Sequence, residues 1–268
     1  MNNRTPFRLS CTSFLFSLLL VTLCGPGADA DSDESVGMRL FREKRYAQAV
    51  PYLLRAVKEN PASVDCHNSL GSSYYHNGDF QPALAEFQKC LQLDPHAKIN
   101  FRYVATIYTA LGRRRESVKV YGELIRKDPK DPDLYYGRAQ ALVGMLSYPQ
   151  AVSDYSTAIS LDSGDFHYFN DRAIAYMKLK QYQKAADDYT KCAKLKPGRL
   201  ETYLGRGDCY VALGKYNQAV ADYTKAIELN PERTRGYVAR AIAYEKNGQA
   251  DLAAADRKRL KEKGDTFD

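Results

Sequence analysis

The stretch LETYLGRGDCYVALGKYNQAVADYTKAIELNPER, from Leu200 to Arg233, contains two amphipathic helical patterns joined by a short turn. Apolar and small residues recur at three- and four-residue steps from Tyr203 to Val211 and again from Ala219 to Ile227, which is the spacing of one helix face. A turn at Gly214 separates the two patterns, and Pro231 ends the second because a proline cannot continue a helix. The stretch therefore predicts a helix–turn–helix unit.

The same design recurs along the chain with a period of 34 residues. The unit-ending prolines are Pro61, Pro95, Pro129, Pro197 and Pro231, and the one missing step falls on Ser163 in the turn sequence LDSGD. Small residues recur in the second helix at Ala49, Ala83, Ser117, Ala151, Ala185, Ala219 and Ala253, and an aromatic follows four positions later at Phe87, Tyr121, Tyr155, Tyr189 and Tyr223. No insertion breaks the period, so the chain is predicted to be an array of repeats.

These phased residues resemble the tetratricopeptide repeat family, whose 34-residue unit carries small residues, aromatics and a proline at fixed places. The resemblance implies an all-α fold, a right-handed α–α superhelix of about seven helix–turn–helix repeats. The expected repeats are approximately 30–63, 64–97, 98–131, 132–165, 166–199, 200–233 and 234–267. Because each helix pair buries its apolar face only against its neighbours, we expect a single elongated solenoid domain over residues 31–268.

The first thirty residues lie outside the repeats and are typical of a secretory signal peptide. Basic residues precede an apolar run from Phe14 to Leu23, and Ala28-Asp29-Ala30 fits a small-x-small cleavage site. The run is about half of the roughly 18 residues that span a bilayer, which favours a signal peptide over residues 1–30 rather than a retained anchor. Lipid attachment at Cys24 is a third alternative. We expect an exported protein, in a periplasm, cell envelope or secretory compartment.

The charge of the chain is modest, with a formal net value of +7. Basic residues gather at Arg113-Arg114-Arg115 and in the last predicted helix, near Arg257 and Lys261. Contact with nucleic acid or anionic lipid is one interpretation of such clusters. Acidic neighbours such as Asp256 and Glu262 dilute the second cluster, which favours a solvated polar face.

Little in the sequence is typical of an enzyme or of a metal site. The four histidines are scattered, and no Cys-x-x-Cys, phosphate-binding glycine loop or Gly-x-Ser-x-Gly motif is present. One charged pattern recurs four times, with an arginine 16 residues before an aspartate: Arg138 and Asp154, Arg172 and Asp188, Arg206 and Asp222, Arg240 and Asp256. A catalytic site is needed only once, so we interpret these pairs as structural. We expect no enzymatic activity, cofactor or metal.

Cys66, Cys90, Cys192 and Cys209 follow the signal region. Export would permit disulfides, and antiparallel pairing of the helices in one unit brings Cys66 near Cys90. The other two are about 9 Å out of register at ~1.5 Å per residue, too far for a disulfide. Two interpretations remain open: a Cys66–Cys90 disulfide, or four small buried hydrophobic residues.

The resemblance places the binding surface on the concave face, which the first helix of each unit lines. Early units have polar residues there and later units have aliphatic ones, which indicates a groove for an amphipathic helix or an extended peptide. The candidate partner-binding residues are Tyr136, Asn170, Ile174, Met177, Leu204, Asp208, Val211, Val238 and Ile242. A register error of one residue would instead place the aliphatic residues in the core.

Co-chaperones of this family hold a C-terminal carboxylate with Lys, Asn, Asn, Lys and Arg over three successive units, and two triplets of units in this chain do not match. The places carry Asn68, Ser72, Tyr103, Asp133 and Gly137 in one triplet, and Asn170, Ile174, Gly205, Arg235 and Ala239 in the other. We predict a non-enzymatic scaffold that binds a protein or peptide partner and assists the assembly or regulation of a complex. The alternatives are an electrostatic binder of an anionic polymer or membrane surface, and an accessory subunit of an enzyme. Membrane contact is also expected if the N-terminal segment is retained or lipidated.

Overall fold

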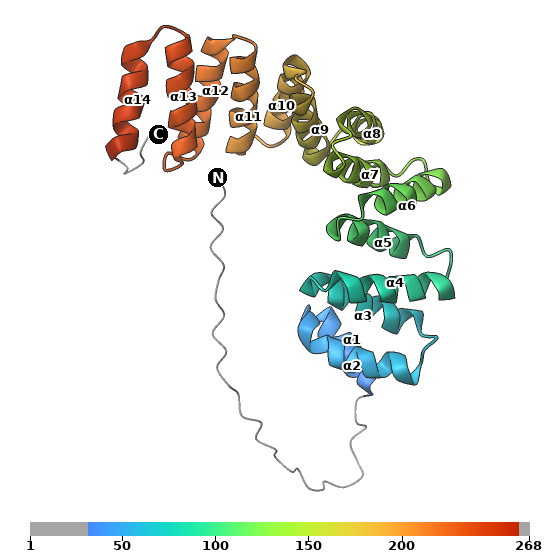
Figure 1. Cartoon of the computed structure of the whole chain (residues 1–268). Coiled ribbons are helices and arrows are strands. Elements are labelled where there is room, and N and C mark those ends of the chain that lie inside the picture. Colours follow the sequence, from blue (N-terminus) through green and yellow to red (C-terminus); the bar gives the residue numbers. More distant parts are fainter. Residues whose placement is uncertain (1–31, 263–268) are drawn as a thin grey trace.

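The structure is a computed structural model, and it describes residues 32–262 of the 268-residue chain. The predicted signal peptide over residues 1–30 lies outside the described residues. Within residues 32–262 the chain forms fourteen helices and no strand. The helices follow one another along an arc (Figure 1), and each packs mainly against its neighbours in sequence. The predicted all-α solenoid is confirmed.

The helices come in seven pairs, and each pair falls within one predicted 34-residue unit. The pairs are α1 (Asp33–Arg42) with α2 (Tyr46–Glu59), α3 (Val64–Asn77) with α4 (Phe80–Leu93), α5 (Lys98–Ala110) with α6 (Arg114–Lys127), α7 (Pro132–Gly144) with α8 (Tyr148–Leu161), α9 (Phe166–Lys178) with α10 (Tyr182–Leu195), α11 (Leu200–Ala212) with α12 (Tyr216–Leu229), and α13 (Thr234–Lys246) with α14 (Ala250–Glu262).

Close contact between units depends on small residues at the points where helices cross. The Tyr189 ring of α10 lies against Gly205 of α11, where an added Cβ would stand 2.6 Å from the ring Cζ. Tyr121 of α6 lies against Gly137 of α7 in the same way. The recurring small residues of the second helices, such as Ala83 and Ser117, are fully buried. The phased glycines, alanines and aromatics therefore form the core between units.

The four repeated Arg–Asp pairs are structural ion pairs, as predicted. Each arginine donates two hydrogen bonds of 2.7–2.8 Å to the aspartate of the second helix in its own unit, and each aspartate is buried. Hydrogen bonding to Asp222 raises the pKa of Arg206, and Asp256 does the same for Arg240. Because breaking a buried ion pair costs about 3–5 kcal/mol, these pairs hold the helices of one unit together.

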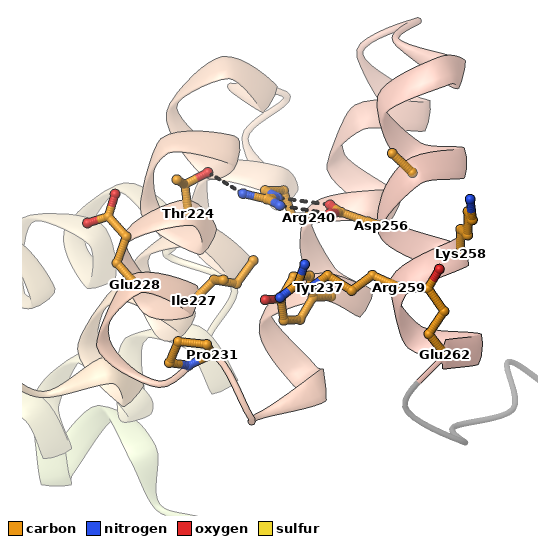
Figure 2. A pocket seen from close by; sticks show the side chains of 11 residues that line it. Thr224, Ile227, Glu228, Pro231, Tyr237, Arg240, Asp256, Lys258, Arg259 and Glu262 are labelled. Carbon is orange, nitrogen blue, oxygen red and sulfur yellow. Dashed lines mark hydrogen bonds and ion pairs between the residues drawn. The ribbon is translucent and has the colours of Figure 1, made fainter.

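Three of these arginines also reach the preceding unit, a contact that sequence reasoning missed. Arg172 donates to Ser156 Oγ at 2.9 Å, Arg206 to Thr190 Oγ1 at 3.1 Å, and Arg240 to Thr224 Oγ1 at 2.9 Å. Figure 2 shows Arg240 between Thr224 and Asp256. The equivalent place beside Arg138 is Gly122, and the Arg138 side chain is 26% exposed against 17% for the other three arginines. Because glycine has no side chain, position 122 offers Arg138 no hydroxyl to link the two units.

Cys66 and Cys90 are separate buried thiols, so the predicted Cys66–Cys90 disulfide is not formed. The Cys90 Sγ instead points to the carbonyl oxygen of Val64, at 3.7 Å. Cys192 and Cys209 are also buried and free. Burial raises the pKa of Cys90, Cys192 and Cys209 to about 12 in each case. The other interpretation, small buried hydrophobic residues, describes all four cysteines.

We expect Gly122→Ser to supply the missing hydroxyl link. An added Cβ would stand 3.9 Å from Arg138 Nη1, which leaves the serine Oγ within reach of the guanidinium. A hydrogen bond to a charged group contributes ~1.5–3 kcal/mol, and serine costs ~0.5 kcal/mol of helix propensity relative to alanine. Gly122→Ser should therefore exceed Gly122→Ala by about 1 kcal/mol in the free energy of unfolding, measured by urea denaturation. Equal stability of the two variants, or the same difference in an Arg138→Met background, would contradict the link.

We expect the protein to lose stability as the pH rises from about 9 toward about 12. The folded thiols of Cys90, Cys192 and Cys209 titrate near 12, whereas unfolded thiols titrate near 9. The unfolded state therefore releases protons first, and the free energy of unfolding falls as pH increases. Urea denaturation at about pH 8 and about pH 10.5 measures the change. A variant with all three cysteines replaced by alanine should show a smaller fall, and an unchanged fall would rule the thiols out as its source.

Candidate partner-binding groove

A hollow of about 590 Å³ opens between α9, α10, α11 and α13. Four predicted partner-binding residues line it: Asn170, Ile174, Met177 and Asp208. Phe166, Lys178, Tyr182, Tyr189, Arg199, Glu201, Gly205 and Arg235 complete the lining. The predicted residues from the fifth unit thus meet one from the sixth unit on the surface that the first helices line.

A second hollow of about 290 Å³ adjoins the first, between α7, α8 and α9. Val143, Tyr148, Tyr155 and Asp171 are among its lining residues. Ile174 and Lys178 line both hollows, and we call the two together the groove. The Ile174 side chain is 41% exposed, so an apolar side chain stands uncovered at the centre of the groove.

The charged residues that line the groove are equal in number, with Lys178, Arg199 and Arg235 basic and Asp171, Glu201 and Asp208 acidic. Glu201 accepts a hydrogen bond from Arg233 at 2.8 Å, and Asp208 accepts one from Arg235 at 3.0 Å. Tyr223 also donates to Asp208, at 2.8 Å. The acidic lining residues Glu201 and Asp208 are thus neutralised by arginines of the next unit.

Two cations of the groove, Lys178 and Arg199, lack such a partner. Neither forms an ion pair with another residue in the range 32–262, and the Arg199 guanidinium lies 5.3 Å from the centre of the Phe166 ring. The groove therefore combines an exposed aliphatic centre with two cations that have no acidic partner in the described part of the chain. Such a surface is complementary to an apolar side chain beside a carboxylate.

Tyr136 is not a free aromatic contact, which corrects the prediction. Its hydroxyl donates to Asp171 of α9 at 2.8 Å, and the Tyr168 hydroxyl donates back to Asp133 of α7 at 2.7 Å. The two tyrosine rings pack with their centres 5.1 Å apart. Burial and, to a lesser extent, the nearby Asp171 raise the pKa of Tyr136 well above its usual range. These residues connect α7 to α9, and sequence periodicity gave no signal for a pairing between neighbouring first helices.

Leu204 is buried, with 1% of its surface exposed, so its prediction as a partner-binding residue is wrong. It packs in a core cluster with Tyr203, Tyr223 and Ala243. Glu201, Gly205 and Asp208 line the groove in this unit, whereas Leu204 is covered although it holds the same repeat position as Asn170. The consequence is that a leucine predicted to contact a partner instead holds two units together.

The last three predicted residues also lie outside the groove. Val211 is half-buried against the cluster that contains Leu204, and Val238 is half-buried against the cluster of Tyr237 and Leu260. Ile242 is 38% exposed but lines neither hollow. Neighbouring side chains partly cover the two valines, and Ile242 is exposed but separate from the two hollows of the groove.

A hollow of about 600 Å³ at the C-terminal end is a weaker candidate. It lies between α12, α13 and α14 (Figure 2), and Arg240 and Asp256 in its wall are already hydrogen-bonded to each other. Arg259 lies over the Tyr237 ring at 5.7 Å. Thr224, Arg240 and Asp256 of this hollow are thus bonded to one another, and none of the predicted partner-binding residues lines it.

Neither a metal site nor a membrane-spanning helix is found within residues 32–262. In that range no group of three or more His, Cys, Asp or Glu side chains is placed to hold a metal ion. The helices of the same range are all too short or too polar to cross a membrane. His67, a buried histidine, has both ring nitrogens engaged, by Glu86 at 2.6 Å and by the Pro61 carbonyl at 3.1 Å.

Comparison with known proteins identifies related sequences. Family models described as tetratricopeptide repeat match residues 37–98, 105–144, 166–199 and 200–233. Hsp70-Hsp90 organizing protein 3 of Arabidopsis thaliana is 25% identical over 108 residues, which are 40% of this chain and 19% of that protein. Superkiller complex protein 3 of Homo sapiens is 32% identical over 91 residues, 34% of this chain and 6% of that protein. The chain thus matches less than a fifth of the length of these relatives.

Solved structures share the fold at low sequence identity. The C-terminal part of a TPR repeat-containing protein from Cytophaga hutchinsonii has a TM-score of 0.73 at 21% identity, covering 82% of this chain and 92% of that one. MamA has a TM-score of 0.59 at 21% identity, covering 63% and 92%. YrrB, described as a TPR protein with an unusual peptide-binding site, has a TM-score of 0.59 at 18% identity, covering 70% and 97%. At these identities the likeness establishes the architecture alone.

The family matches and the structure agree on the nature of the chain. The matched segments cover more than half of the sequence, and they fall on the helices of the repeats seen in the structure. This architecture and these relatives support a protein–protein interaction scaffold. The chain belongs to the tetratricopeptide repeat family.

Proposed function

We propose that this protein is a non-enzymatic scaffold that binds a polypeptide partner in the groove and helps to assemble or regulate a complex. The observation that carries the proposal is Ile174, an exposed aliphatic side chain shared by two adjoining hollows. An isoleucine side chain that is exposed to water contributes hydrophobic free energy only when another apolar group packs on it. The hollow of about 590 Å³ is large enough for side chains of a bound peptide.

The chemistry of the groove defines the partner segment. An apolar side chain would pack on Ile174 and Met177, and an acidic side chain or a terminal carboxylate would lie near Lys178 and Arg199. Asn170 adds an amide, although its Nδ2 already donates to Asp171 at 3.0 Å. We therefore propose a peptide that has an apolar anchor next to an acidic group.

The test uses two isoleucines that share one repeat position. Ile174 and Ile242 are 68 residues apart, or two periods, and are 41% and 38% exposed, but only Ile174 lines the groove. Peptides selected from a displayed random library on the wild-type protein should lose at least about tenfold in affinity for Ile174→Asp and keep it for Ile242→Asp. Fluorescence anisotropy measures both.

Two outcomes would refute the groove. One is an equal effect of the two isoleucine substitutions on peptide affinity. The other is a selected peptide set without acidic residues that binds Lys178→Glu as well as the wild-type protein, since that charge reversal should weaken an acidic ligand. Circular dichroism melting controls for folding, and Leu204 is left unchanged because it belongs to the core.

We also propose that the protein is exported, a proposal supported by the apolar run from Phe14 to Leu23 and the Ala28-Asp29-Ala30 site. Cleavage after Ala30 predicts a protein that begins at Asp31. Mass spectrometry of the N-terminal peptide of the protein isolated from its own cells tests this. A chain that retains Met1, or that begins at a lipid-modified Cys24, would replace cleavage with an anchor.

A further inference from the structure

The turns that join the first and second helix of each unit follow one edge of the solenoid, because turns of neighbouring units contact each other. The contacts are a stack of the Tyr46 and His76 rings at 4.3 Å, a hydrogen bond from Lys215 to Gln183 at 2.8 Å, and one from Asn247 to Asn217 at 2.6 Å. We call this edge the turn rim. The turns between successive units form the opposite edge.

The turn rim carries an unusual leucine. The turn after each first helix contains a residue with left-handed backbone, which is glycine in four units: Gly78, Gly112, Gly214 and Gly248. The other three units have Lys44, Leu146 and Lys180 there, with φ of 60°, 60° and 58°. Asparagine and aspartate tolerate this conformation better than other residues with a side chain, and a branched apolar residue is strained in it. Leu146 is also 70% exposed, so neither backbone preference nor burial in the fold explains it.

The charge of the turn rim differs from that of the opposite edge. Between paired helices the basic residues are Lys44, Arg45, Arg113, Lys180 and Lys215, and the acidic residues are Glu43 and Asp79. Between successive units the basic residues are Lys130, Lys196, Arg199 and Arg233, and the acidic residues are Asp94, Asp128, Asp131, Asp162, Asp165 and Glu232. The turn rim thus has an excess of positive charge and the opposite edge an excess of negative charge.

Cations stand on both sides of Leu146. On one side the Arg114 side chain lies across Gly144, so close that an added Cβ would meet its Nε. On the other side Lys178 lines a hollow together with Val143 and Tyr148, which flank the Leu146 turn in sequence. Leu146 is therefore an exposed apolar tip between basic side chains.

We propose that the turn rim docks on an anionic membrane surface, with Leu146 and the adjacent Met145 inserted at the lipid interface. The apolar tip lies on a turn and lines neither hollow of the groove nor the C-terminal hollow, so it suits insertion into a lipid interface. Basic residues of the turn rim lie in units on both sides of Leu146, at Lys44, Arg45 and Arg113 and at Lys180 and Lys215. Membrane binding of this kind adds the burial of apolar groups to the attraction of each cation for acidic lipid. This inference does not depend on the groove.

A tryptophan reporter tests the proposal directly, because the chain contains no tryptophan. In the full chain, Leu146→Trp is compared with His96→Trp, at an exposed position on the opposite edge. The Leu146→Trp emission should shift to shorter wavelength with vesicles of phosphatidylcholine and phosphatidylglycerol, and should not shift with phosphatidylcholine alone. The His96→Trp emission should stay unchanged. An N-terminal apolar segment that binds vesicles would affect both variants and both kinds of vesicle, so the comparison isolates the rim.

Charge variants supply the second measurement. Arg115 and Lys180 are exposed and line neither groove hollow. Each cation near an acidic membrane contributes about fivefold in affinity, so replacing both with glutamine in the Leu146→Trp chain should weaken vesicle binding roughly twentyfold. Leu146→Gly should raise the thermal midpoint by removing backbone strain, while weakening sedimentation with the anionic vesicles.

Three results would overturn the inference. The first is no emission shift of Leu146→Trp on anionic vesicles. The second is an equal shift of the two tryptophan variants. The third is a shift caused by soluble polyglutamate and not by vesicles, which would assign the rim to an acidic polypeptide instead. Circular dichroism of each variant establishes that the helices are intact.

Discussion

Each helix pair in this protein has an apolar face that it covers only by stacking on the next pair. In two places a ring packs directly on a glycine of the next unit, Tyr121 on Gly137 and Tyr189 on Gly205, where no side chain larger than hydrogen fits without movement of the ring. Such contacts require the period to stay constant from one unit to the next. A single inserted residue would rotate the rest of a helix by about 100° and carry its small residues away from the neighbouring ring.

The half-buried arginines fix how one unit is placed on the next. Arg206 binds both carboxylate oxygens of Asp222 in its own unit and the hydroxyl of Thr190 in the preceding unit. Its charge is therefore satisfied only when two successive second helices are correctly placed, since a buried charge without partners is costly. Apolar contact tolerates some sliding between helices, whereas these hydrogen bonds do not.

Each proposed functional surface contains a residue that departs from the repeat pattern or that no neighbouring side chain covers. Ile174 is exposed between two hollows, and Leu146 occupies a left-handed position where four other units have glycine. The groove and the turn rim meet at Lys178, which lines both hollows of the groove and lies beside the Leu146 turn.

Most of the fold was predictable from the sequence. The repeat, the seven helix pairs and the Arg–Asp pairs all depend on spacing within a unit, which the period makes visible many times over. The site was predictable only in part. Asn170, Ile174, Met177 and Asp208 line the groove, but Tyr136 is committed to Asp171 of the next unit.

Leu204 shows why the sequence predicts the site only in part. It occupies the same repeat position as Asn170, 34 residues later. One lines the groove and the other is covered by Tyr203, Tyr223 and Ala243. The sequence by itself determined the helices, their order and the pairs that close each unit, because these follow from periodic contacts along the chain. Only the tertiary structure decided which side chains remain exposed, because exposure depends on the particular residues that neighbouring units bring against each position.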